Sequence, residues 1–272
     1  MHRLPVRPAT IDSFHPAGPC KTPHVLGDDL GQLLGPRIPA DHSRQTVADD
    51  YATGYLSRTD RPAAPRVMDL GCGRGDSIDL FRGLDPAVRW TGVDLERSPE
   101  VDERTREDAE FVTFDGIHLP FEDRSFDLVY CKQVLEHVRH PDPLIAEVAR
   151  VLAPGGWFAG STSQLEAFHS RSIFNHTPYG LTLMIEDAGL EVIELRPVID
   201  GLTLVAWRTL GLPSFFYRWW GPRESPLHRV IELAGRARGL DARTRNQIKL
   251  TLCGQFAFLA SRRVVPKGLK RG

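Results

Sequence analysis

The sequence predicts an α/β fold in which helices cover both faces of a mainly parallel, doubly wound sheet. Two observations lead to this prediction. Apolar strand segments alternate with helical segments along the chain, and one strand runs directly into a glycine-rich loop that a helix follows. Polar residues and glycines also come directly after several strands. Because open α/β sheets bind ligands beyond the carboxyl ends of their strands, these positions are candidate binding residues.

The strands are predicted from short apolar runs that turn residues bound, and the helices from apolar residues at helical spacing and from capping residues. Seven strands are expected, over residues 66–70, 88–94, 110–114, 126–131, 157–162, 191–196 and 252–261. The expected helices cover residues 41–57, 76–84 with Asp76 as N-cap, 142–152 with Asp142 as cap and Pro143 at the first helical position, and 177–188, which Gly189 terminates.

A single domain is expected over residues 41–265, between a leader of residues 1–40 and a basic tail of residues 266–272. The leader holds seven of the 21 prolines, which predicts an irregular segment. Within the domain, residues 199–249 interrupt the alternation of strands and helices. We expect them to form a helical insert, rich in aromatic and basic residues, with a capped helix that begins at Ser225.

Charge is distributed unevenly along the chain. The formal net charge is −1, yet residues 208–272 contain 14 Lys and Arg residues and only three Asp and Glu residues. Such a segment is typical of a surface that meets an anionic ligand, a nucleic acid or a membrane. It is equally typical of a solvated basic face that compensates an acidic body within the same fold.

The four cysteines lie far apart in the sequence and form no C-x-x-C pair. This spacing predicts neither a disulfide framework nor a zinc site, and it fits a reducing compartment. Prolines interrupt the N-terminal segment, so it lacks the apolar core of a signal peptide, and no apolar run has the length of a membrane span. We therefore expect a soluble, cytoplasmic protein.

The most informative local feature is the loop after the first strand, Gly71-Cys72-Gly73-Arg74-Gly75. Glycines there let the backbone turn sharply and let a ligand approach closely. The spacing G-x-G-x-G is shorter than the dinucleotide fingerprint G-x-G-x-x-G, which argues against NAD-dependent reduction as a function. Taken alone, the loop is also compatible with an ordinary glycine-rich turn.

Two acids end the next two strands. Asp94 ends the second strand, where a carboxylate can accept hydrogen bonds from both hydroxyls of a ribose. Asp115 closes the third strand, where it can accept the exocyclic amine of adenine while Gly116 leaves room for the ring. The simpler alternatives are a surface acid at Asp94 and an Asp-Gly turn at Asp115.

Six short motifs occur in order over about residues 65–195: Asp69-Leu70-Gly71-Cys72-Gly73-Arg74-Gly75, Gly92-Val93-Asp94, Asp115-Gly116-Ile117-His118-Leu119-Pro120-Phe121, Phe126-Asp127-Leu128-Val129, Val134-Leu135-Glu136-His137 and Leu152-Ala153-Pro154-Gly155-Gly156. In this arrangement the chain resembles the type 11 class of class I S-adenosylmethionine (SAM)-dependent methyltransferases, which includes the quinone-pathway methyltransferases. The resemblance implies a Rossmann-like sheet of seven strands, of which the last is antiparallel.

The same resemblance implies that SAM is the cofactor and that residues at the strand ends bind it. The implied contacts are Gly71, Cys72 and Gly73 for the methionine portion, Asp94 for the ribose, Asp115 and Gly116 for the adenine, and Cys131 with Lys132 beside the sulfonium, with Asp69 and Leu95 flanking them.

A sulfonium methyl group is already activated, so the protein mainly has to align an O, C or N nucleophile behind it. A base is needed only if the acceptor must lose a proton. His137, His169 and His176 follow strands four and five and are the candidates, although each also fits a structural or substrate-orienting role. Tyr179 is a candidate substrate contact in the same region. No metal site is expected, because the scattered His and Asp residues lack ligand spacing.

The insert is expected to act as a lid over a small acceptor that is hydrophobic or carries a phosphate, with Trp219 and Trp220 as contacts. One hypothesis adds peripheral contact with an anionic membrane surface, whereas the alternative packs these aromatic side chains onto the sheet. An RNA methyltransferase and a non-catalytic SAM-binding protein remain alternatives. Nucleic-acid binding is disfavoured because no RNA-binding module is recognisable.

Overall fold

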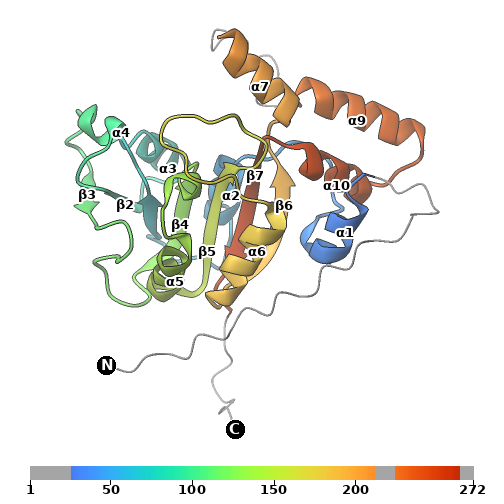
Figure 1. Ribbon diagram of the computed structural model, residues 1–272. Helices are drawn as coiled ribbons and strands as arrows, with labels where there is room; N and C mark the ends of the chain where they lie inside the picture. Colours follow the sequence, from blue (N-terminus) through green and yellow to red (C-terminus); the bar gives the residue numbers. More distant parts are fainter. Residues whose placement is uncertain (1–25, 212–223, 264–272) are drawn as a thin grey trace, which may run out of the picture.

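The computed structural model describes residues 26–211 and 224–263, and these residues contain a seven-stranded sheet flanked by helices (Figure 1). The strands are β1 (Arg66–Leu70), β2 (Arg89–Asp94), β3 (Glu110–Thr113), β4 (Phe126–Lys132), β5 (Leu152–Ser163), β6 (Glu191–Pro197) and β7 (Gln255–Ser261). They lie in the order β3-β2-β1-β4-β5-β7-β6, and β7 runs antiparallel to both of its neighbours. The predicted Rossmann-like fold with an antiparallel last strand is confirmed.

Two strands begin three or more residues away from their predicted starts. β5 begins earlier, at Leu152, because Gly155 and Gly156 exchange backbone hydrogen bonds with Arg262 at 2.9 and 3.1 Å. The predicted loop therefore continues the ladder with the end of the chain's last strand. β7 begins later, at Gln255, because a helix occupies the first predicted position.

The helices follow the prediction along the core. They are α1 (Asp28–Leu34), η1 (Gly35–Arg37), α2 (Ala48–Leu56), α3 (Ser77–Leu84), α4 (Pro99–Asp102), η2 (Leu135–His137), α5 (Pro141–Val151), α6 (Pro178–Asp187), α7 (Gly201–Leu210), α9 (Pro226–Ala237) and α10 (Ala242–Leu252). Of these, α1, η1, α4 and η2 lie where none was expected. The described part of the leader thus contains α1 and η1, which corrects the prediction of an irregular segment there. Residues 1–25 lie outside the described residues.

The prediction of a helix from residue 41 onward is wrong at its start, because α2 begins only at Ala48. The preceding residues are held by tertiary contacts that a helix would not permit. The Thr46 amide donates to the carbonyl of Pro197 at 3.1 Å, and the Ser43 carbonyl accepts from Lys249 at 2.6 Å. Contacts with distant segments therefore override local helical spacing here.

Helix α5 also begins earlier than predicted. Pro141 takes the first helical position, where its missing N–H costs nothing, so Asp142 lies in the first turn and is not the cap. The predicted start of α6 at Thr177 is confirmed. Thr177 is the N-cap, and its hydroxyl accepts from the Gly180 amide at 3.0 Å. Asp76 occupies the N-cap position of α3 without a side-chain bond to the helix.

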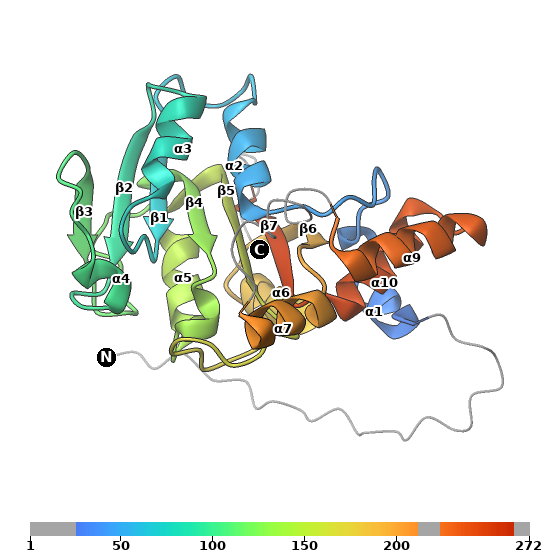
Figure 2. The same cartoon turned by 90° about the horizontal axis from the view of Figure 1, so that it is seen from above.

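Helices α2 and α3 cover one face of the sheet, and α5 and α6 cover the other (Figure 2). Successive side chains of a strand point to opposite faces. Tyr130 of β4 accordingly packs in the cluster beside α2 and α3, whereas its neighbour Cys131 packs in the cluster beside α5 and α6. The ends of β1, β2 and β4 lie between these two layers.

The predicted helical insert is confirmed as α7, α9 and α10, which connect β6 to β7 and lie beyond one end of the sheet, beside α1 (Figure 1). Lys249 of α10 is completely buried. Its ammonium donates to a carboxylate oxygen of Glu224 and one of Glu232, each at 3.0 Å. Together with the Ser43 contact, this network joins the segment ahead of α2 to the insert.

Residues 215–220 of the insert, including Trp219 and Trp220, and the basic tail of residues 266–272 lie outside the described residues. Of the helices in the described ranges, none combines the length and the apolar character needed to cross a membrane.

Candidate functional site

The loop after β1 adopts a backbone conformation that glycine takes far more readily than other residues. Gly71, Gly73 and Gly75 have φ angles of 73°, 51° and 83°, in the left-handed region. A Cβ atom on Gly71 would lie 2.4 Å from a methyl carbon of Val134, and one on Gly75 would lie 2.7 Å from the ring of Phe111. The loop therefore needs glycine for its turn and for close contact with neighbouring elements.

Asp94, at the end of β2, holds this loop in place. Its Oδ2 accepts from the Gly73 amide at 2.7 Å, and its Oδ1 accepts from the Leu95 amide at 2.7 Å. The Gly71 amide donates to the Val93 carbonyl, also at 2.7 Å. Each carboxylate oxygen has a second lone pair, so Asp94 retains capacity for a ribose hydroxyl. Leu95 takes part through its backbone, while its side chain is exposed.

Asp69, the next-to-last residue of β1, lies close to the same loop and is only 4% exposed. Its Oδ2 accepts a hydrogen bond from the Ser77 hydroxyl, which in turn accepts one from the Trp90 indole at 3.1 Å. Burial raises the pKa of Asp69 to about 7, and the charge of Asp94 adds to the rise, while the Ser77 bond opposes it. Near neutral pH the carboxyl group is therefore poised between its two protonation states.

Because this pKa is raised above the unfolded value of 3.8, Asp69 binds a proton more tightly in the folded chain. The free energy of unfolding should then fall as pH rises between about 4 and 7. We expect Asp69→Asn to gain stability relative to the wild type over that window, by up to about 4 kcal/mol, because asparagine cannot ionise. Urea unfolding at pH 5 and pH 8 measures this difference; an equal difference at both pH values would contradict it.

Arg104, in the segment between β2 and β3, contacts the glycine loop, and the sequence analysis did not single it out. Its Nε and Nη2 donate to the Gly73 carbonyl at 2.8 and 2.6 Å, and its guanidinium carbon lies 4.0 Å from the centre of the Phe111 ring. The Cys72 thiol packs beside it and is buried, which raises its pKa. Cys72 therefore contributes its backbone to the loop rather than a reactive thiol.

At the expected adenine position, the Asp115 carboxylate organises a turn. Its Oδ1 accepts from the amides of Ile117 and His118, at 2.8 and 2.6 Å, and its Oδ2 lies 2.7 Å from Nδ1 of His118. The bonds to His118 lower the pKa of Asp115 to about 2. Gly116 follows with a φ of 90°, so the two predicted residues are adjacent, with Asp115 exposed and Gly116 partly buried.

The two residues predicted beside the sulfonium point in opposite directions. The Cys131 side chain is completely buried in the cluster beside α5 and α6, so only its backbone faces the site. The Lys132 ammonium lies 2.8 Å from Oδ1 of Asp49, which also accepts from the Tyr130 hydroxyl. Asp49, from the first turn of α2, thus reaches the end of β4, and sequence reasoning missed it.

The three candidate histidines separate into two groups. The rings of His137 and His169 meet edge to face, with 5.3 Å between their centres, at the ends of β4 and β5. His176 is buried, and its Nε2 lies 3.1 Å from the Leu135 carbonyl, which indicates a structural role. Tyr179 lies in the first turn of α6 and packs against the core cluster of that face.

The side chain of Glu136, also at the end of β4, is completely buried beside these two histidines. One of its oxygens and a ring nitrogen of each histidine lie within 4.8 Å of one another. One Glu136 oxygen accepts from the Thr162 hydroxyl at 3.0 Å and the other lies 3.1 Å from the Ser163 hydroxyl oxygen, so polar groups surround the buried carboxylate without a cation. The absence of a metal is predicted from ligand spacing along the sequence. Spacing of that kind says nothing of residues that separate loops bring together, so the absence of a metal stays a prediction.

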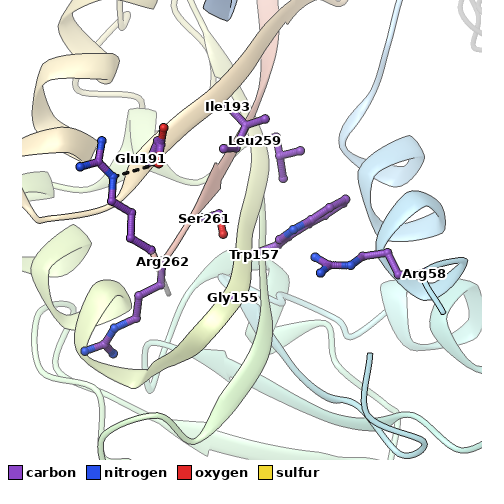
Figure 3. Close-up of a pocket in the computed structure, with 9 residues that line it drawn as sticks. Arg58, Gly155, Trp157, Glu191, Ile193, Leu259, Ser261 and Arg262 are labelled. Carbon is purple, nitrogen blue, oxygen red and sulfur yellow. Dashed lines mark hydrogen bonds and ion pairs between the residues drawn. The ribbon is translucent and has the colours of Figure 1, made fainter. Parts of the chain in front are cut away.

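A cavity of about 530 Å³ opens at the opposite end of the parallel strands, beside the start of β5 and the end of β7 (Figure 3). Trp157 stands in it next to Arg58, whose guanidinium carbon lies 5.0 Å from the indole ring. The arginines that line the cavity are already paired with carboxylates or carbonyls, as Arg263 is with Glu191 at 2.9 Å. Because the cavity lies at the opposite end of the strands, it is separate from the candidate site.

Comparison with known proteins places the glycine loop within a shared domain. A family model described as a methyltransferase domain matches residues 68–160. The chain is 32% identical over 162 residues to a probable S-adenosylmethionine-dependent methyltransferase of Mycolicibacterium smegmatis, covering 55% of this chain and 61% of that protein. It is 29% identical over 113 residues to a ubiquinone biosynthesis O-methyltransferase of Burkholderia orbicola, covering 40% and 49%. The chain thus spans less than two thirds of these relatives.

Solved structures share the fold at low sequence identity. The [4+2]-cyclase SpnF superposes with a TM-score of 0.52 at 18% identity, covering 87% of this chain and 92% of that one. A phosphoethanolamine N-methyltransferase of Haemonchus contortus, solved in complex with SAM, gives 0.50 at 17% identity, covering 79% and 53%. At these identities the likeness concerns the fold alone.

Proposed function

Because the chain belongs to the type 11 family of class I SAM-dependent methyltransferases, we propose that it transfers the sulfonium methyl group of SAM to an O, C or N atom of a small acceptor. The observation that carries this proposal is the glycine loop bonded to Asp94 at the ends of β1 and β2. In an open α/β sheet this is where a ligand binds. The carboxylate and the side-chain-free backbone fit the ribose and the methionine portion of SAM.

On this proposal, the chain's residues bind and orient more than they react. The backbone of the loop from Gly71 to Gly73 packs against the cofactor, the carboxylate of Asp94 accepts from it, and Asp115 with Gly116 receives the adenine. When bound, SAM supplies an activated methyl group. The protein then has to place a nucleophile in line behind it, and alignment of this kind is worth roughly 7–11 kcal/mol in favourable cases.

The acceptor side is proposed to lie beyond the ends of β4 and β5, where His137 and His169 meet. An imidazole can act as a general base toward an O–H or N–H acceptor, so both rings are candidates for this role. Exposed Leu165 and Phe168 on the loop after β5 give this side an apolar wall, which supports a hydrophobic acceptor. Trp219 and Trp220 remain proposed contacts of that acceptor.

The experiment that tests the proposal is incubation of the protein with radiolabelled SAM and fractionated host extract, with and without EDTA. We expect label in a small-molecule fraction. Because no metal is predicted to take part, transfer should be unchanged with EDTA. Label confined to RNA would favour an RNA methyltransferase. Tight SAM binding without transfer to any fraction would favour a non-catalytic SAM-binding protein.

We also propose peripheral contact with an anionic membrane surface through α9. On this helix Val230 and Leu233 are 61% and 70% exposed, and Arg229 and Arg236 are exposed as well. Exposed apolar side chains beside arginines are typical of helices that lie on a membrane surface. Co-sedimentation with anionic vesicles is expected to fall with added salt; absence of binding at low salt would refute the contact.

A further inference from the structure

Glu166, in the loop after β5, is a buried carboxylate that the sequence analysis did not single out. Its side chain is completely buried, although its neighbours Leu165 and Phe168 are exposed. A carboxylate removed from water is stable only where donors and cations replace its hydration. The groups that Glu166 contacts therefore indicate what it does.

Three elements supply those groups. Oε2 accepts from the Ser163 hydroxyl of β5 at 2.5 Å and from the side-chain amide of Gln255 of β7 at 2.9 Å. Oε1 forms an ion pair with Arg208 of α7 and lies 3.3 Å from Nδ1 of His169. The sheet thus fixes one oxygen of Glu166, while the other faces a guanidinium and an imidazole.

His169 lies where the methyl acceptor is proposed to bind. Its ring meets His137, and 17% of its side chain is exposed. Burial lowers the pKa of His169 below its ordinary value, and the charge of Glu166 opposes that change. A neutral imidazole carries its proton on one nitrogen and accepts with the other, so a partner at Nδ1 decides which nitrogen accepts.

We propose that Glu166 is a positioning residue that keeps the His169 proton on Nδ1, so that Nε2 takes the proton of the acceptor. This inference rests on the proposed function and applies to a neutral O–H or N–H acceptor. The acceptor's electron pair forms the bond to the methyl carbon, and the carbon–sulfur bond breaks with its pair left on sulfur. The acceptor's proton passes to Nε2, and the Glu166 carboxylate stabilises the resulting imidazolium.

Arg208 connects this pair to the insert. It reaches Glu166 from α7, its side chain is 38% exposed, and it shares the oxygen that faces His169. A guanidinium on the same oxygen weakens the attraction between Glu166 and an imidazolium. The placement of α7 therefore sets how strongly Glu166 supports His169.

Nitrogen-15 NMR of the full chain labelled at histidine tests the inference without any acceptor. In the wild type we expect His169 as the Nδ1-protonated tautomer, and in Glu166→Gln a loss of that preference. Absence of the signal in His169→Gln assigns it. Glu186→Gln is the matched control, since it removes a comparable ion pair with Arg37 on another part of the molecule. An Nε2-protonated His169 in the wild type, or an unchanged tautomer in Glu166→Gln, would overturn the inference.

The rate of methyl transfer from radiolabelled SAM to the extract fraction that the wild type methylates is the second readout. We expect Glu166→Gln to lower the rate at saturating SAM about 10- to 100-fold, with the Kd for SAM unchanged. A merely structural role would instead lower thermal stability and SAM affinity together. If Glu166→Gln does not fold, Glu166→Asp replaces it, because its shorter side chain withdraws the carboxylate from Nδ1.

The two readouts separate this inference from the proposed function. If the wild type methylates no fraction, the proposed function fails, and the tautomer of His169 still decides whether Glu166 orients it. If the wild type transfers methyl groups and Glu166→Gln does so at the same rate, only the role of Glu166 is refuted.

Discussion

Replacement of Gly71 with alanine is expected to weaken SAM binding strongly. An alanine in the left-handed conformation at this position costs about 1–2 kcal/mol, and its Cβ would lie 2.4 Å from Cγ2 of Val134. The loop must shift to relieve that contact, which moves its backbone away from the cofactor position and strains the Gly73–Asp94 bond. Titration calorimetry should show a Kd raised at least about 100-fold, the equivalent of roughly 2.7 kcal/mol.

Gly83→Ala is the matched control for Gly71→Ala. Gly83 lies in α3, and a Cβ atom there would meet nothing within 4 Å. Alanine in a helix is favoured over glycine by about 1 kcal/mol, so this variant should bind SAM normally and unfold no more easily. The double variant Gly71→Ala, Val134→Ala removes the two closest atoms and should recover part of the affinity. Wild-type affinity in Gly71→Ala alone would refute the assignment of this loop.

Asp94→Ala is the second substitution with a large expected effect. It removes the acceptor of the Gly73 and Leu95 amides and, on the proposed function, the acceptor of both ribose hydroxyls. Hydrogen bonds to a charged group contribute about 1.5–3 kcal/mol each. We therefore expect the Kd for SAM to rise on the order of 100-fold, measured by calorimetry at constant ionic strength.

Asp60→Ala controls for loss of a paired aspartate elsewhere. Asp60 is exposed and pairs with Arg58 at 2.7 Å, so its removal should change neither SAM affinity nor folding. Unchanged affinity in Asp94→Ala would show that the ribose binds elsewhere. Equal weakening in both variants would point to a general effect of charge.

The parts of this site that are predictable from sequence are those with a local cause. Gly71, Gly73 and Gly75 are recognisable because a sharp turn needs residues without a Cβ atom. Asp94 and Asp115 are recognisable because each follows a strand, and strand ends converge at one edge of a parallel sheet. The order of these residues along the chain is sufficient to predict that they lie together.

Arg104, Asp49 and Glu166 could not be found in the same way. Arg104 reaches the Gly73 carbonyl from a segment without periodicity. Asp49 reaches Lys132 from a helix 83 residues earlier in the chain, and Glu166 meets His169 and Arg208 only after folding. Each depends on the packing of elements distant in sequence, which propensity and spacing do not encode.

The same cause explains the errors in element ends. The start of α2 is set by the bonds of Ser43 and Thr46 to α10 and β6, and the start of β5 by its ladder with Arg262. Local preference is weak compared with such contacts, so it predicts that an element exists better than where it begins.

The central claim is that the glycine loop and Asp94 form a SAM site. Titration calorimetry of the purified chain with SAM, and separately with NAD, tests it most directly. We predict saturable binding of one SAM per chain and no binding of NAD, because the loop is too short for the dinucleotide pattern. Binding of NAD without binding of SAM would contradict the claim.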